Sequence, residues 1–285
     1  MANETTSSTV SELYTEIVAE ALFVAQEQSI MRGLVRNYTI AGGGKSVEVP
    51  IYSAVSAAAV NEATDLSNTA VNPSSVTITA TEKGVMTTLT DLARNSAPRN
   101  VAGDIGRLFG EAIAKKIDKD LTALFGGFST TVGSASTAMS ASLIFQAVAK
   151  LRANSVPGDN LSAVIHPQVA FDLKSGLTNT FANPNPGVGN EALRSGLVGQ
   201  IAGVNIFETS NMTDSSSNDP GTTGDYKGAV FHPEALGLAM MQDLKIETQR
   251  DASLRADEIV ATAVYGVSEL NDTNGCEVEA DSSIQ

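Results

Sequence analysis

The sequence contains few of the residues from which catalytic and metal sites are usually built. It has one cysteine, two histidines and no tryptophan, and only 5% of its 285 residues are aromatic. A single cysteine, Cys276, excludes an internal disulfide and fits folding in a reducing compartment. His166 and His232 are each followed by proline and are too far apart in sequence for zinc-ligand spacing. We therefore predict no catalytic residue, no metal and no cofactor.

Positive charge and long apolar runs are also scarce. The chain has 32 acidic and 18 basic residues, which gives a net charge of −14. This sign argues against a protein that holds nucleic acid through phosphate contacts, because such contacts need clustered lysine and arginine. No apolar run approaches the roughly 18 residues of a membrane span, and the first ten residues do not resemble a secretory signal. We expect no membrane partner, and a chain of this length can bury a large core.

One short segment resembles a nucleotide-binding motif. Residues 42–46, GGGKS, match the end of a phosphate-binding P-loop, but that motif needs a glycine where this chain has Thr39. It also needs a helix after the Lys-Ser pair, whereas the next residues, SVEVPIY, alternate apolar and polar side chains as a strand does. We favour a glycine-rich turn that enters a strand, and a nucleotide-binding enzyme is the less favoured alternative.

The strongest local pattern predicts a long helix over residues 101–125, which we call the spine helix. Asn100 is a good N-cap residue, and Gly126 and Gly127 end the helix. Apolar residues recur at helical spacing on the face predicted to be buried: Val101, Ile105, Leu108, Phe109, Ala112, Ile113, Ile117, Leu121, Leu124 and Phe125. The face predicted to be exposed carries Asp104, Arg107, Glu111, Lys115, Lys116, Asp118, Lys119 and Asp120. Glu111 precedes Lys115 by four residues, the favourable order for an ion pair.

Two alternating segments, 46–52 and 75–81, predict the legs of a long hairpin. Its tip, about 53–74, is rich in alanine, serine, threonine and asparagine. Because a two-stranded ribbon is only marginally stable in water, we expect this one to lie on another surface. Upstream, the capping-box pattern at residues 9–12 predicts an N-terminal arm helix that continues to about Arg32.

The second half of the chain alternates strand and helix patterns. We predict helices at 91–95, 143–153 and 167–173, and strands at 161–166, within 197–207, and at 229–231, 244–248, 257–267 and 276–278. Residues 128–142 are predicted to form an irregular connection and residues 176–190 a loop. The pattern as a whole predicts an α+β fold.

The order of these parts, together with three local motifs, resembles the major capsid protein of tailed double-stranded DNA bacteriophages, whose shell fold is shared with herpesviruses and encapsulins. The motifs are AVIHPQVAFDLKSGL, GLVGQIAGVNIFETSNM and the closing run that begins GAVFHPEALGLAMM. Together the matching parts cover about residues 9–280. The resemblance implies four parts. An N-terminal arm covers residues 1–40 and an extended hairpin loop covers 41–88. A peripheral domain with the spine helix covers 89–155 and 244–270, and an axial α/β domain covers 156–243 and 271–285.

The resemblance also implies a function. We expect a structural protein, not an enzyme, which self-assembles into pentamers and hexamers of an icosahedral shell around double-stranded phage DNA, without reading its sequence. The partners expected are further copies of the chain, a separate scaffolding protein and a portal, with a decoration protein as a further candidate. The protein would be assembled in the host cytoplasm and reside in the virion. An encapsulin-type compartment shell is the alternative.

One contact between subunits is predicted at the level of residues. The hairpin, residues 46–81, contains acidic residues, including Glu62 and Asp65, and no basic residue, whereas the spine helix exposes Arg107, Lys115 and Lys119. The resemblance implies that the extended loop crosses a neighbouring subunit near its spine helix. We therefore predict that these opposite charges meet between chains. The alternative is that Glu62 and Asp65 only keep an unassembled hairpin soluble.

Overall fold

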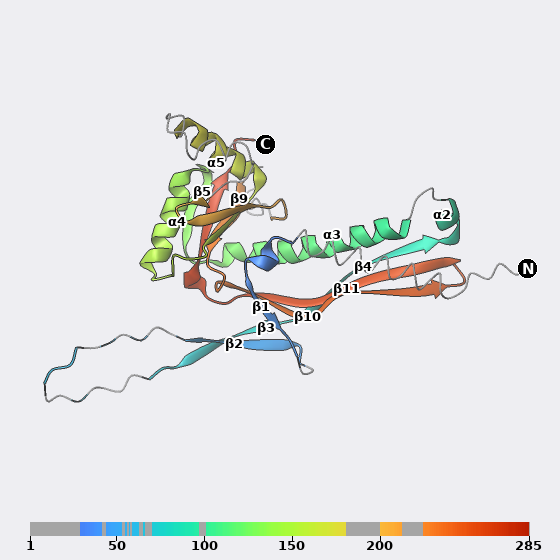
Figure 1. The fold of residues 1–285 in the computed structure, drawn as a ribbon, viewed down its shortest axis with the longest axis horizontal. Coiled ribbons are helices and arrows are strands. Elements are labelled where there is room, and N and C mark those ends of the chain that lie inside the picture. Colours follow the sequence, from blue (N-terminus) through green and yellow to red (C-terminus); the bar gives the residue numbers. More distant parts are fainter. Residues whose placement is uncertain are drawn as a thin grey trace, which may run out of the picture.

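The computed structural model describes residues 29–41, 44–52, 55, 57, 59–62, 65, 70–96, 101–180, 200–212 and 225–284. Three parts diverge from a common centre (Figure 1). A long four-stranded sheet and the helix α3 extend to one side, a six-stranded sheet with two helices rises at the other end of α3, and a two-stranded hairpin projects away from both. No helix in the described part of the chain is long and apolar enough to cross a lipid bilayer.

The four-stranded sheet is built around two long antiparallel strands, β10 (Leu236–Asp251) and β11 (Ala256–Glu269). β4 (Thr81–Thr90) pairs antiparallel with β11, and β1 (Arg36–Thr39) pairs parallel with β10. The sequence predicted β11 over residues 257–267, nearly its whole length, but only residues 244–248 of β10. It did not predict β4. The polar residues of β4 give no clear strand signal, so its conformation comes from pairing with β11 along ten residues.

Helix α3 (Val101–Thr122) continues as the 3-10 helix η2 (Ala123–Gly127), which confirms the predicted spine helix. Its buried stripe, with Phe109, Ile113, Ile117 and Leu121, packs on the sheet in one core with β10 and β11. The assignment of residues to the buried and exposed faces of α3 was wrong at three positions. The predicted N-cap residue, Asn100, lies outside the described residues. Leu108 is 62% exposed and Ala112 is also exposed, whereas Asp118 is 0% exposed. The sheet covers a stripe slightly rotated from the one that the apolar pattern predicts.

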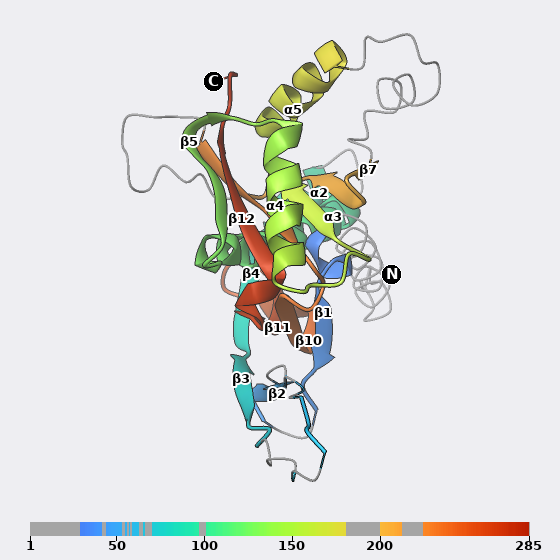
Figure 2. The same ribbon diagram turned by 90° about the vertical axis from the view of Figure 1, so that its left-hand side faces the viewer.

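The six-stranded sheet combines segments from the middle and the end of the chain. Its order is β5 (Thr131–Ala138), β12 (Gly275–Asp281), β9 (Asp225–Phe231), β6 (Ser162–Ile165), β8 (Val204–Glu208) and β7 (Gln200–Ile201). Helices α4 (Ala141–Ala153) and α5 (Pro167–Thr180) share a hydrophobic core with these strands. Figure 2 shows α4 in front of the sheet.

Two predictions for this layer need correction. Residues 128–142 were predicted to be an irregular connection but contain β5, which pairs parallel with β12. The loop predicted at 176–190 was wrong for residues 176–180, which belong to α5, and the rest of that prediction lies outside the described residues. The predicted division into domains stays a prediction. The packing places α4 and β5 with the six-stranded sheet, whereas that division assigned them to the segment 89–155 together with α3.

The hairpin consists of β2 (Ser46–Tyr52) and β3 (Pro73–Thr79), which pair antiparallel from Ser46↔Thr79 to Tyr52↔Pro73, as predicted. A strand therefore follows Lys45 directly, in place of the helix that a P-loop requires. The predicted arm helix lies almost wholly outside the described residues. Its last residues belong to the short 3-10 helix η1 (Met31–Gly33). The short helix predicted after Thr90 is α2 (Asp91–Ser96).

Candidate inter-subunit surfaces

Part of the charge on helix α3 is neutralised within the chain. Lys115 Nζ lies 3.8 Å from Glu111 Oε2, which confirms the ion pair predicted from the sequence. The side chain of Lys115 remains 56% exposed. Lys119 is exposed, and no partner of its amine lies within the described ranges. Arg107 is also exposed but already interacts with another group of its own chain. Lys115 and Lys119 are therefore the cations on this face that are most open to a second molecule.

Asp120, which the sequence placed on the same exposed face, connects α3 to the sheet. Its carboxylate accepts hydrogen bonds from Lys116 Nζ at 2.7 Å and Tyr265 Oη at 2.9 Å, and Lys83 Nζ lies 3.5 Å away. Burial alone would raise the pKa of Asp120, but the hydrogen bonds and the positive charge of Lys83 outweigh it and lower the pKa. Three elements, α3, β4 and β11, are thus joined through one carboxylate.

Asp118 holds the beginning of the described chain against α3. Its carboxylate accepts hydrogen bonds from Ser29 Oγ at 2.9 Å, Ile30 N at 3.3 Å and Met31 N at 3.2 Å. Burial raises the pKa of Asp118, and these hydrogen bonds offset part of the rise. A buried carboxylate therefore fixes residues 29–31 against the spine helix. Helical periodicity gave no signal for this role, because it classes every aspartate as outward-facing.

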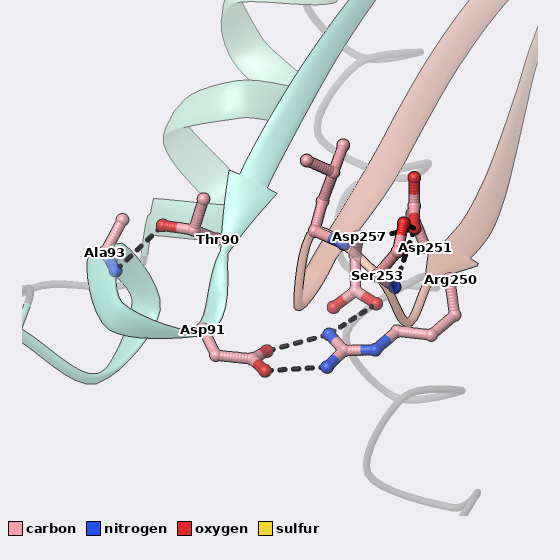
Figure 3. Close-up of polar contacts among 8 residues, drawn as sticks. Thr90, Asp91, Ala93, Arg250, Asp251, Ser253 and Asp257 are labelled. Atoms are coloured by element: carbon pink, nitrogen blue, oxygen red, sulfur yellow. Dashed lines mark hydrogen bonds and ion pairs between the residues drawn. The ribbon is translucent and has the colours of Figure 1, made fainter.

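The far end of the long sheet is closed by a cluster of charged groups (Figure 3). Arg250 donates to both carboxylate oxygens of Asp91, at 2.7 and 2.6 Å, and its Nη1 also donates to Asp257 at 3.2 Å. Thr90 Oγ1 accepts a hydrogen bond from Ala93 N and so caps the first turn of α2. The paired arginine therefore ties α2 to the end of the β10–β11 strand pair. Leu92 is 80% exposed beside it.

The segment between the two hairpin strands carries both charged and apolar exposed side chains. Glu62 and Asp65 are exposed there, as are three apolar side chains, Val55, Val60 and Val71, which are 52–54% exposed. Tyr52, the last residue of β2, is 67% exposed. Within one chain, the hairpin and α3 extend in different directions (Figure 1), so the structure does not bring Glu62 and Asp65 to Arg107, Lys115 or Lys119. Contact between these groups requires two chains and stays a prediction.

The histidines and the cysteine have roles in packing and turns. In each His-Pro pair the histidine Nδ1 accepts a hydrogen bond from the backbone N two residues later, and His166 also stacks on Tyr226 with ring centroids 3.6 Å apart. Cys276 is fully buried, and burial raises the pKa of its thiol to about 11. Among the residues that the structure describes, no three histidine, cysteine or acidic side chains form a group that could hold a metal ion.

Solved structures with this architecture include several phage capsids. The chain aligns with the capsid structure of cyanophage P-SCSP1u at a TM-score of 0.70 and 20% identity, covering 90% of this chain and 89% of that one. A structure from Mycobacterium phage Che8 aligns at a TM-score of 0.67 and 24% identity, covering 82% of this chain and 84% of that one. The head structure of Helicobacter pylori bacteriophage KHP40 aligns at a TM-score of 0.68 and 14% identity, covering 88% of this chain and 91% of that one. The protein therefore has the α+β fold of phage capsid subunits, as expected.

A family model described as phage capsid protein matches residues 73–275, which is more than half of the chain. The chain belongs to this family of phage capsid proteins, and its role is structural. The resemblance inferred from the sequence motifs is thereby confirmed. A comparison with curated proteins finds no match.

Proposed function

We propose that this protein is the subunit that forms pentamers and hexamers of an icosahedral phage shell around double-stranded DNA. The observation that carries the proposal is the hairpin, which leaves the body of the subunit with an apolar side only partly covered. On one face of the hairpin, Ile78 at the base is fully buried, and Val47, Val49 and Val76 are partly covered. Farther out, in the segment that joins the two strands, Val55 and Val60 are exposed.

An apolar side of this kind needs a partner surface. A two-stranded hairpin is marginally stable alone, and contiguous exposed apolar side chains mark interaction sites. A second copy of the chain supplies this surface if the hairpin of each subunit packs on the next subunit and each subunit in turn carries the hairpin of the previous one. Such head-to-tail contacts close into rings when the rotation between subunits allows it. Rings of five and six copies then join into a shell.

The charge of the protein suits an enclosing wall more than a DNA-binding surface. A net charge of −14 disfavours strong contacts with phosphates, so DNA can be packed inside without adhering to the wall. In the proposed shell, the six-stranded layer faces the symmetry axes, the long sheet with α3 lies at the periphery, and the hairpin overlaps a neighbour. Assembly in the host cytoplasm uses a separate scaffolding protein and a portal, and a decoration protein is a further candidate partner.

The test compares assembly of the wild-type chain with that of a variant that lacks the exposed apolar side chains of the hairpin. Val55→Ser, Val60→Ser and Val71→Ser are combined, and each chain is expressed with and without the scaffolding protein. Wild type should form closed shells in electron micrographs, whereas the variant should remain as small species with an unchanged melting temperature. Asn61→Ser with Thr77→Ser, at exposed polar positions of the same hairpin, is the matched control. A wild-type chain that stays monomeric with scaffold at high concentration would contradict the proposal.

A further inference from the structure

The base of the hairpin rests on the four-stranded sheet at two glycines, Gly237 of β10 and Gly266 of β11. β3 contacts both of these strands where it ends. Both glycines are buried and neither has a positive φ, so any side chain could adopt their backbone conformation. Space, and not backbone freedom, is what distinguishes glycine at these positions.

At Gly266 the hairpin backbone lies directly on the sheet. A Cβ added there would be 2.3 Å from the carbonyl oxygen of Thr79 and 2.7 Å from its carbonyl carbon. Both separations are far below van der Waals contact, so no side-chain layer fits between the last residue of β3 and β11. Thr79 is the residue at which β3 ends, and the facing partner of Gly266 across the strand pair is Ala239, which is also small.

At Gly237 the contact is between the glycine and side chains. An added Cβ would lie 2.9 Å from Ile78 Cδ1 and 3.1 Å from two methyl carbons of Leu270. Ile78 is 0% exposed and, with Ile40, Ala80, Ala239 and Leu270, forms a small core that is separate from the two main ones. The hairpin is therefore anchored by one buried side chain that occupies the space above Gly237.

The connection from hairpin to sheet leaves little freedom for other orientations. Ala80 N donates to Lys45 O at 2.7 Å, which closes the base of the hairpin, and the next residue, Thr81, already pairs with Tyr265. One residue thus separates the last hairpin pair from the first pair of the sheet. The direction of the hairpin then depends on how closely β3 can approach the two strands below it.

We infer that Gly266 and Gly237 set the direction in which the hairpin leaves the subunit, and thereby the geometry with which it reaches a neighbouring copy. The second part rests on the proposed shell function. Each leg of the hairpin extends about 23 Å, at roughly 3.3 Å per residue, so a lift of about 1 Å at the base, which a new methyl group requires, moves the tip by more than that. These two residues act by positioning the hairpin and not by contacting the neighbour.

The first experiment compares Gly266→Ala with Gly33→Ala, where an added Cβ meets no atom within 4 Å. Spin labels on cysteines introduced at Asn61 and Gln249 report the distance from the hairpin tip to the sheet in the unassembled chain. In the Gly266→Ala chain, the distance between the two labels should differ from that in wild type. The yield of closed shells from this variant should fall by about tenfold, which matches the free-energy cost of overpacking one buried contact. The Gly33→Ala chain should match wild type in both.

A second variant keeps the inference testable if Gly266→Ala does not fold. Gly237→Ala places its methyl group against the end of the flexible Ile78 side chain, and Ile78→Val removes the Cδ1 atom that it meets. Gly237→Ala should shift the label distance and reduce shell yield, and the double variant should recover both. Unchanged label distances in both alanine variants, or no recovery in the double variant, would overturn the inference. If wild type forms no shells while the distances shift as expected, the proposed function fails and the positioning role of the glycines stands.

Discussion

At the residue scale, two aspartates on one helix show how location decides the behaviour of a carboxylate. Asp118 and Asp120 are separated by a single residue, but burial dominates at Asp118 and raises its pKa, whereas cationic and phenolic donors lower that of Asp120. Asp118 accepts from backbone amides of another segment, and Asp120 from Lys116 and Tyr265. The first positions the N-terminal segment, and the second attaches α3 to the sheet.

We expect Asp118→Ala to lower the free energy of unfolding by about 1–3 kcal/mol, because the buried donor of Met31 and the partly buried donors of Ser29 and Ile30 lose their acceptor. Urea unfolding of the unassembled chain measures the loss. Amide exchange should also become faster at Ile30 and Met31. Lys119→Ala, on the exposed side of the same helix, is the control and should change little. Equal stabilities of the two variants would show that Asp118 is not the anchor of this segment.

A second residue-scale prediction concerns Glu269, where β11 leaves the long sheet. Burial raises the pKa of Glu269, and the neighbouring Asp272 carboxylate raises it further. The folded protein therefore keeps this proton at pH values where the unfolded chain has lost it. The stability that the group contributes is fully present below the ordinary value of 4.5 and is lost as pH rises through the raised folded-state pKa.

Glu269→Gln cannot ionise, so its free energy of unfolding should fall less than that of wild type as pH rises above 4.5. Urea unfolding at several values between about pH 4 and pH 8 measures the two slopes. Glu234→Gln, at an exposed position in the turn between β9 and β10, is the control. Parallel pH profiles for wild type and Glu269→Gln would contradict the assignment.

At the element scale, a polar attachment joins the far end of the two longest strands to a short helix. The strands β10 and β11 extend well beyond the six-stranded layer, and Arg250 links them to α2 at that far end (Figure 3). Exposed ion pairs contribute little to global stability, but a bidentate arginine restricts geometry. Helix α2 has only six residues and depends on such attachments, since short helices are not stable alone.

Arg250→Ala should therefore loosen α2 and the adjoining turn while leaving the global melting temperature nearly unchanged. Hydrogen exchange of the α2 amides is the measurement, and these amides should exchange faster than in wild type. Arg250→Lys keeps the charge but loses the two-pronged contact with Asp91, so it should give an intermediate exchange rate. Exchange at α2 identical to wild type in the alanine variant would show that the capping bond of Thr90 is sufficient.

At the scale of the whole molecule, the four-stranded and six-stranded sheets meet where three chain segments pass from one to the other. Ala235 O accepts from Leu270 N, Asn274 O accepts from His232 N, and Asp272 accepts from Ser129. The segments after η2, between β9 and β10, and between β11 and β12 thus hold one another. These hydrogen bonds join the four-stranded and six-stranded sheets, and the hairpin projects away from both (Figure 1).

The predicted contact between subunits belongs to this scale. Reversing Glu62 and Asp65 to lysine should weaken assembly, more so at low salt, because the hairpin then repels Lys115 and Lys119 of a neighbour. A single exposed pair contributes roughly 0–1 kcal/mol, but a shell repeats it at every subunit. Adding Lys115→Glu and Lys119→Glu should partly restore assembly, as measured by light scattering and electron microscopy. If the fourfold variant assembles no better than the hairpin variant, these acids serve only solubility.

The sequence by itself determined the elements whose signals are local. The apolar spacing from Phe109 to Leu121 required a helix, the alternation from Ser46 to Tyr52 required a strand, and the motifs around His166 and His232 identified the family. These patterns depend on contacts between residues near in sequence or on one continuous face, so they can be read without the fold.

Only the tertiary structure decided which polar residues are buried and where weak strands pair. β4 and β5 are rich in serine, threonine and glycine, and they become strands because β11 and β12 offer free edges. Asp118 is buried because a segment some 90 residues away brings its amide donors to that place. The hairpin takes its direction from Gly266, whose contact with Thr79 forms only when β3 crosses β11. Each of these depends on partners distant in sequence, and a periodic pattern carries no information about such partners.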